Sequence, residues 1–212
     1  MADPATTLPT YAEYLAMEAA SPEKHEWIAG EIRAMAGSSA AHARLCARVT
    51  AILEHRLRGK PCAPYSADLR VRAESIDVST YPDISVVCGE PQRASDDKHG
   101  FVNPTLLVEV SSPSTERYDR GEKFEYHRAL DTLRDYVLVD QHQPLITHFY
   151  RDGKSGLWSS REYGAGEHVR IKSLGLRIAV DRVYEGITLE PRPPRRPGLL
   201  VVKEAPLPYA TQ

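Results

Sequence analysis

The chain has 212 residues, of which 42% are hydrophobic and 26% are charged, and its formal net charge is −2. This composition is typical of one globular domain and argues against a protein that binds nucleic acid over its whole surface. No apolar run is as long as a membrane span and the N-terminus lacks a secretory pattern, so we expect a cytoplasmic protein. Three cysteines without CxxC spacing make a disulfide framework and a zinc knuckle unexpected.

The first sixty residues predict two helices separated by a hairpin. Thr10 is a suitable N-cap for a short helix that extends to Met17, and residues 25–33 read as a hairpin that turns at Ala29-Gly30. Ser38 or Ser39 begins a longer helix that continues to about Arg58. Its apolar positions follow helical spacing and are Leu45, Val49, Ile52, Leu53 and Leu57.

The central part of the chain alternates strands with one further helix. Strands are expected near residues 68–72, 84–87 and 106–110, and the polar stretch 90–100 predicts a mobile loop. A helix should follow from residue 114 to about residue 130. Further strands are expected at 136–140, 146–150, 157–161, 169–171 and 176–178, with a helical turn at 181–184.

This order predicts a mixed α/β fold, with a β-sheet flanked by helices and added β-hairpins. We assign residues 1–189 to a single domain. Residues 190–212 contain six prolines, which cannot sustain a helix or a central strand, so we expect an extended tail.

Two carboxylates interrupt apolar strands, where a buried charge is costly. Asp83 opens the run 83–87, and Glu109 lies inside the run 105–111. If these strands pair, the two side chains approach each other, and a divalent cation such as Mg²⁺ or Mn²⁺ would relieve both repulsion and desolvation. Ser111 is two residues beyond Glu109 and therefore shares its face of the strand.

The helix that follows offers a lysine for the same site. Asp119, Lys123 and Tyr126 are spaced i, i+4 and i+7, so they share one helical face that can pack over the sheet. An ammonium beside two metal-binding carboxylates is the apparatus for phosphodiester hydrolysis, with Lys123 orienting the attacking water. Glu31 and His42 are weaker candidates for the site, and Arg44 and Arg48 could contact phosphates if they border it.

Each residue also has a structural interpretation. Asp83 could be a turn residue after Pro82, and Glu109 could belong to a structural ion pair. Asp119 and Lys123 could form an ordinary helical pair, and His42 lies on an apolar stripe where a core histidine is common. The functional interpretation therefore depends on the residues meeting in space.

Pro82-Asp83, the segment 107–115, Asp119 and Lys123 together resemble the Uma-type restriction endonuclease family of the PD-(D/E)XK nuclease superfamily. The resemblance extends from about residue 11 to residue 184. It includes the segments 26–32, 122–128 and 133–141 and the residue His42.

The resemblance implies a restriction-endonuclease-like core and assigns Asp83, Glu109 and the Val110 carbonyl as metal ligands. The superfamily places a lysine two residues after the glutamate, where this chain has Ser111. In Uma-type proteins the lysine has moved to the next helix, at Lys123 here. The resemblance also implies that Glu31 is a further acidic member of the site.

We therefore expect a Mg²⁺- or Mn²⁺-dependent endonuclease that acts on DNA as a homodimer. In this hypothesis Asp119 and Tyr126 orient Lys123, and Ser111 bonds to a water on the ion. One alternative is a catalytically silent module of the same fold that binds nucleic acid or a protein partner. Another is a structural protein in which Asp83, Glu109 and Lys123 form a buried salt-bridge network.

Overall fold

The computed structural model describes residues 8–35, 37–112, 115–189 and 191–192. Its centre is a six-stranded sheet in the order β11-β10-β9-β8-β6-β3. Strand β8 pairs antiparallel with β6 and parallel with β9, so the sheet is mixed, as predicted. The strands are β3 (Cys62–Ser66), β6 (Ile84–Cys88), β8 (Pro104–Ser111), β9 (Asp135–Asp140), β10 (Leu145–Arg151) and β11 (Trp158–Gly164).

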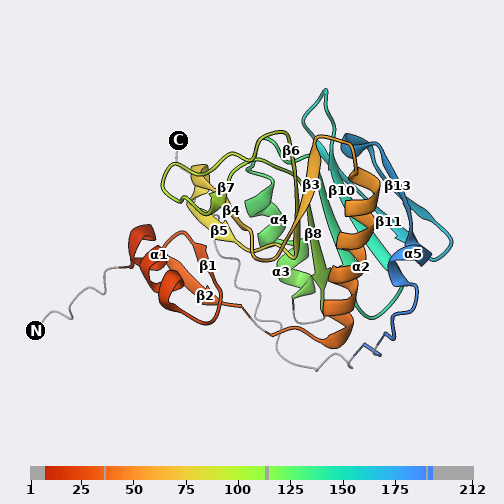
Figure 1. Ribbon diagram of the computed structural model, residues 1–212, viewed down its shortest axis with the longest axis horizontal. Helices are drawn as coiled ribbons and strands as arrows, with labels where there is room; N and C mark the ends of the chain where they lie inside the picture. Colours follow the sequence, from red (N-terminus) through yellow and green to blue (C-terminus); the bar gives the residue numbers. More distant parts are fainter. Residues whose placement is uncertain (1–7, 36, 113–114, 190, 193–212) are drawn as a thin grey trace, which may run out of the picture.

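Helices cover both faces of this sheet (Figure 1). The even positions of β8 face α2 (Ala40–Leu57) and pack in one core cluster with Leu45, Val49 and Leu53. Leu107 faces the opposite side and packs with Phe124 of α4 (Glu122–His127), which follows α3 (Glu116–Arg120). The period of two along β8 therefore directs Glu109 toward α3 and α4 and away from α2.

Helix α2 begins where the sequence predicts. The Ser39 side chain accepts a hydrogen bond from the His42 amide at 3.1 Å, which satisfies one of the unpaired donors of the first turn. On the α2 side, the core is completed by α5 (Val180–Tyr184) and by the hairpin of β12 (His168–Ile171) and β13 (Leu176–Ala179), joined by the turn η2 (Lys172–Leu174).

A second sheet, in the order β2-β1-β5-β4-β7, lies beyond α3 and α4 with α1 (Tyr11–Ala20) against it (Figure 1). The predicted hairpin is present, and Ala29 and Gly30 have φ values of 45° and 98° at its tight turn. The strands are β1 (His25–Ile28), β2 (Glu31–Ala34), β4 (Arg70–Ala73), β5 (Val78–Thr80) and β7 (Gly100–Phe101), and η1 (Glu74–Ile76) joins β4 to β5.

Three local features differ from the sequence predictions or add to them. The helix expected at 114–130 is broken at Gly121, whose φ of −108° and ψ of −101° interrupt the helix; a Cβ there would lie 2.9 Å from the Arg117 carbonyl oxygen. The loop at 90–100 is anchored because Asp97 receives two hydrogen bonds from the buried Arg70 guanidinium, at 2.6 and 2.9 Å. Strands β3, β5 and β7 were not predicted.

The cysteine prediction also needs correction. Cys62 and Cys88 are directly opposite each other on β3 and β6 and form a disulfide, which the count and spacing of cysteines did not indicate. Most of the proline-rich tail lies outside the described residues, although Arg192 forms ion pairs with Glu116 and Asp140. Among the described residues, no helix is long and apolar enough to cross a membrane.

Candidate active site

Glu109 and Lys123 meet between β8 and α4. The Lys123 Nζ lies 3.0 Å from Glu109 Oε1, and the two side chains are only 6% and 4% exposed. This contact follows from the fold because Glu109 points to the helical side of β8 and α4 packs over that face. The predicted approach of carboxylate and ammonium is therefore present.

A second carboxylate binds the same ammonium and was not predicted as a site residue. Glu26 Oε1 of β1 lies 3.2 Å from Lys123 Nζ, and the Tyr118 hydroxyl donates a hydrogen bond to Glu26 Oε2 at 2.9 Å. The sequence did hold a signal: Glu26 precedes Trp27 and Ile28 in a short strand, and it is buried with them. Glu31 was predicted instead, because the family resemblance implied that it is a further acidic member of the site.

Asp83 lies at the start of β6, beside Glu109. Its Oδ2 accepts a hydrogen bond from the Val110 amide at 2.7 Å, and its own amide donates to Glu109 Oε2 at 3.4 Å. The pairing of β6 with β8 produces this approach, because Ile84 is opposite Val108. The Asp83 side chain is 14% exposed and that of Glu109 is 4% exposed, so Asp83 is the more accessible of the two.

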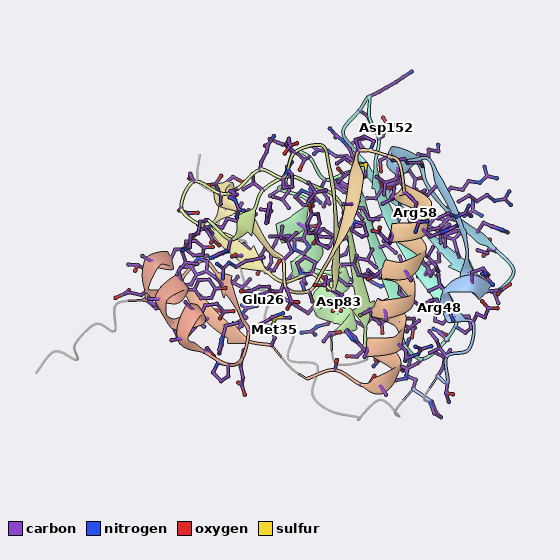
Figure 2. The ribbon with its side chains drawn as sticks, in the orientation of Figure 1. Glu26, Met35, Arg48, Arg58, Asp83 and Asp152 are labelled. Carbon is purple, nitrogen blue, oxygen red and sulfur yellow. A yellow bond between two sulfur atoms is a disulfide. The ribbon has the colours of Figure 1, made fainter. Side chains whose placement is uncertain are left out.

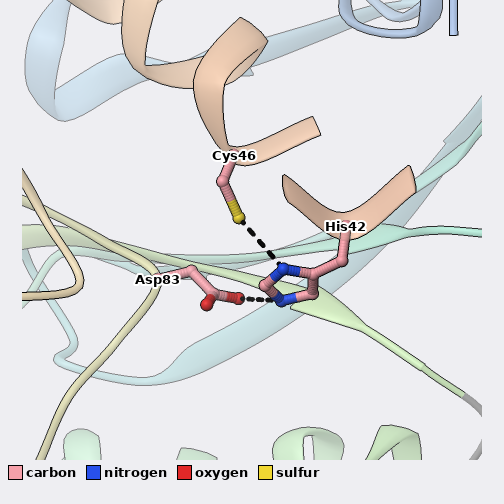
Figure 3. Close-up of side chains that lie close together, drawn as sticks. All are labelled: His42, Cys46 and Asp83. Atoms are coloured by element: carbon pink, nitrogen blue, oxygen red, sulfur yellow. Dashed lines mark hydrogen bonds and ion pairs between the residues drawn. The ribbon is translucent and has the colours of Figure 1, made fainter. Parts of the chain in front are cut away.

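His42 contacts Asp83 from the opposite face of the sheet. Its Nε2 lies 3.1 Å from Asp83 Oδ2, and its Nδ1 lies 3.5 Å from Cys46 Sγ on the next turn of α2 (Figure 3). The sequence placed His42 on an apolar stripe and made Asp83 a metal ligand, but it gave no reason to connect the two. Their contact extends the site from α4, through Asp83 at the start of β6, to α2.

Burial and crowded charge dominate the electrostatics. Burial raises the pKa of Glu109 well above its usual range, and the nearby carboxylates of Asp83 and Asp119 raise it further, although Lys123 opposes them. Burial alone would lower the pKa of Lys123, but the carboxylates of Glu109, Glu26 and Asp119 outweigh it and raise that pKa well above the usual range. Lys123 is therefore a charged ammonium at neutral pH.

Asp119 is buried on the same side as Lys123. Burial raises its pKa, whereas the charge of Lys123 and the nearby hydroxyls of Thr115 and Ser111 lower it. The Asp119 carbonyl accepts a hydrogen bond from the Tyr136 hydroxyl at 2.8 Å, which fixes α3 against β9. Asp119 thus acts on Lys123, and Ser111 lies near Asp119.

Two predicted members of the site lie at its edge. Glu31 is exposed and pairs with Arg33 at 2.7 Å. Tyr126 is half-buried, and the charges that act on its hydroxyl are those of Glu122, Arg33 and Glu31. The break at Gly121 separates Tyr126 and Asp119 onto two helices, so the i, i+7 relation predicted between them does not hold.

The two predicted phosphate-binding arginines lie on α2. Arg44 is exposed. Arg48 donates a hydrogen bond to the Glu185 carbonyl at 2.7 Å and thereby ties the end of α5 to α2. Figure 2 shows Arg48 on the side of α2 that faces α5, whereas Asp83 lies on the other side.

The donor set suits a divalent cation with oxygen ligands. Glu109, Glu26 and Asp119 surround the ammonium of Lys123, and Asp83 adjoins Glu109. Burial is the main cause of the raised pKa values of Glu109 and Asp119, and the charge of Asp83 raises both further. A divalent cation between Asp83 and Glu109 would favour the charged form of both carboxylates.

Comparisons with known proteins agree with this geometry. The Uma2 family, described as "Putative restriction endonuclease", matches residues 11–182. Two curated relatives from Synechocystis sp. (strain ATCC 27184 / PCC 6803 / Kazusa) are similar to the chain. "Uncharacterized protein slr1290" is 38% identical over 82% of this chain and 90% of its own length. "Uncharacterized protein sll1609" is 32% identical over 70% of this chain and 84% of its own length.

A solved structure shares the fold. It is the crystal structure of a protein from Anabaena variabilis, described as a putative nuclease belonging to DUF820. The match has a TM-score of 0.67 at 16% identity and covers 83% of this chain and 97% of the other. The mixed α/β architecture predicted from the sequence is thereby confirmed.

Proposed function

We propose a function from the premise that this chain belongs to the Uma2 family, described as "Putative restriction endonuclease". In this proposal the chain hydrolyses phosphodiester bonds in DNA with the help of a divalent metal ion. The observation that supports this proposal best is the contact of Lys123 with Glu109, beside Asp83 and at the end of two paired strands. Two acidic oxygens and one ammonium in one place are the parts that such a hydrolysis requires.

In this proposal Asp83, Glu109 and the Val110 carbonyl hold Mg²⁺ or Mn²⁺. The amide of Val110 already donates to Asp83, so the strand backbone orients this carboxylate. When bound, the ion would lower the pKa of a water molecule and stabilise negative charge on the phosphate. Asp83 and His42 form the accessible side of the site, with side chains 14% and 20% exposed, and the phosphate would approach from there.

In this proposal Lys123 acts as a hydrogen-bond donor, because its pKa is raised. Because it keeps its proton at neutral pH, it can donate hydrogen bonds to the attacking water and to the phosphate but cannot accept a proton. Glu26 and Asp119 hold the ammonium in place, and Tyr118 in turn holds Glu26. Ser111 supports Asp119 in the same arrangement.

We assign the remaining predicted features to substrate binding and assembly. Arg44 is exposed on α2, the helix that also carries His42, and can contact a phosphate beyond the site. Cleavage of both strands of a duplex requires two sites, which a homodimer would supply. A cytoplasmic location would give the enzyme access to DNA.

The experiment is a nuclease assay on supercoiled, linear and single-stranded DNA with Mg²⁺ or Mn²⁺. The variants are Asp83→Asn, Glu109→Gln and Lys123→Met, and the control is His55→Asn, at an exposed position on α2. We expect loss of about 100-fold or more for each site variant and no loss for the control. Cleavage that survives Lys123→Met at the wild-type rate would refute the role given to this residue.

One observation favours the silent module as a second candidate. Glu109 and Lys123 are almost completely buried, and the position that carries the superfamily lysine is Ser111. Titration calorimetry with Mn²⁺ on the wild type and on Asp83→Ala separates the two candidates. Binding that depends on Asp83 supports the enzyme, and the lack of such binding supports the module.

A further inference from the structure

A second group of potential metal ligands adjoins the proposed catalytic pair. His42 and Cys46 are one turn apart on α2 and project toward Asp83 (Figure 3). One nitrogen of His42, the thiol sulfur of Cys46 and one oxygen of Asp83 all lie within 4.8 Å of one another. Each of the three is partly buried, so a bound ion would be sheltered and still reachable.

The spacing of the sulfur and nitrogen matches that of two ligands on one tetrahedral ion. Zinc binds sulfur at about 2.3 Å and imidazole nitrogen at about 2.0–2.1 Å, so a tetrahedral angle places these atoms about 3.5 Å apart. Cys46 Sγ and His42 Nδ1 are 3.5 Å apart. This pair is therefore spaced for one ion, whereas Asp83 Oδ2 contacts the other ring nitrogen, Nε2, and would have to shift to join the pair on that ion.

The chemistry of these ligands differs from that of the proposed catalytic pair. Thiolate and imidazole favour Zn²⁺ and similar transition metals, whereas Mg²⁺ favours oxygen ligands alone. Three protein ligands also leave one tetrahedral position for water or an anion. The helical spacing of i, i+4 places both ligands on one face, as helical metal-binding motifs do.

We propose that His42, Cys46 and Asp83 form a binding site for Zn²⁺ or a similar transition metal, which shares Asp83 with the proposed Mg²⁺ site. The sharing rests on the function proposed above, but the zinc site itself does not. Because the two cations would share one carboxylate and repel each other, zinc weakens the binding of the catalytic ion and inhibits cleavage.

The binding test uses the whole chain, freed of metal by a chelator and kept reduced, with Co²⁺ as the probe. A cobalt–thiolate site gives a charge-transfer absorption band and intense tetrahedral bands, and added Zn²⁺ should abolish both. Cys46→Ser should remove the charge-transfer band, and His42→Asn should weaken Co²⁺ binding by about tenfold or more.

Two control variants isolate the site. His55→Asn removes an exposed histidine of the same helix, and the double variant Cys62→Ser/Cys88→Ser removes the thiols that reduction of the disulfide would release. Both should keep the wild-type cobalt spectrum. A spectrum without a charge-transfer band in the wild type, or one unchanged in Cys46→Ser, would overturn the proposal.

A second measurement tests the shared carboxylate separately. With Mn²⁺ bound, electron paramagnetic resonance should show its release as Zn²⁺ is added to the wild type, with no release at the same zinc concentration in Cys46→Ser. Glu109→Gln should lose Mn²⁺ binding and keep the cobalt–thiolate spectrum, so failure of the proposed nuclease site can be distinguished from failure of this one. Zinc binding that leaves the affinity for Mn²⁺ unchanged would show that Asp83 is not shared.

Discussion

Removing Glu109 and removing Lys123 should have unequal effects on the stability of the metal-free protein. The ammonium of Lys123 lies 3.2 Å from Glu26 and 3.0 Å from Glu109, so it neutralises two buried carboxylates. Glu109, in contrast, is one of several carboxylates near that ammonium, and its raised pKa shows that its surroundings oppose its charge. Lys123→Met should therefore be costly, and Glu109→Gln should not.

The magnitudes follow from these distances. At an effective dielectric constant of about 20, unit charges about 3 Å apart attract by about 5 kcal/mol before desolvation is counted. Lys123→Met leaves buried carboxylates without their partner and should lower the free energy of unfolding by about 3–5 kcal/mol. Glu109→Gln leaves Glu26 to pair with Lys123, so we expect a change within about 1 kcal/mol, or a gain in stability.

The assay is urea unfolding at pH 7 in the presence of a chelator, followed by circular dichroism. A buried ion pair elsewhere in the chain provides the matched control. Arg70 binds Asp97 through two hydrogen bonds. Although burial raises the pKa of Asp97, the contacts with Arg70 and its other partners lower it below its usual value, so this ion pair stabilises the charged carboxylate. Asp97→Asn should cost about 3–5 kcal/mol, in contrast to Glu109→Gln.

A loss in Glu109→Gln as large as that in Asp97→Asn would refute the reasoning. It would mean that Glu109 is a structural partner of Lys123 and that the charge around it is balanced. Added Mg²⁺ offers a second check, because it should stabilise the wild type and leave Glu109→Gln unchanged. An equal response of both proteins to Mg²⁺ would place the ion elsewhere.

Three further predictions concern other parts of the fold. Burial lowers the pKa of His127 well below 6.5, so its contribution to stability is present above pH 6.5 and is lost as the pH falls toward the folded pKa. In urea unfolding between pH 7.5 and 5, His127→Gln should remove a slope that approaches about 1.4 kcal/mol per pH unit, and an unchanged slope would contradict this assignment. Cys62→Ser/Cys88→Ser should cost about 3 kcal/mol under oxidising conditions and little under reducing ones, as measured by thermal unfolding, whereas equal losses in both would exclude a disulfide in solution. Gly121→Ala should lower the free energy of unfolding in urea by about 1–3 kcal/mol and reduce cleavage, because the added Cβ would meet the Arg117 carbonyl oxygen and shift Lys123. Full stability and activity of this variant would show that the backbone accommodates the added Cβ.

The sequence predicted the elements whose signals are local. The serine cap and apolar stripe of α2, and the Ala29-Gly30 turn, lie within a few residues of the structure they determine. The cap, the apolar stripe and the turn need no knowledge of the rest of the chain. The approach of Asp83 to Glu109 was predicted on the condition that their two strands pair, and the pairing of β6 with β8 meets that condition.

Apart from the helix break at Gly121, the missed features depend on contacts between distant segments. Glu26 lies 97 positions before Lys123 in the chain, and its role appears when β1 is placed against α4. Asp97 belongs to a polar loop whose order comes from Arg70, and the Cys62–Cys88 bond needs the register of β3 against β6. Composition and periodicity cannot indicate which segments of different elements will meet.

Asp83 lies between the two proposed metal sites and contacts residues of both. On one side its backbone amide reaches Glu109, and on the other its carboxylate reaches His42 across the end of the sheet. Glu109 and Cys46 belong to opposite faces, so each can be changed without removing a ligand from the other. Asp83 cannot be changed in this way, because Asp83→Asn would weaken the binding of both proposed ions at once. A comparison of Glu109→Gln, Cys46→Ser and Asp83→Asn therefore tests whether one carboxylate joins two metal sites or belongs to one.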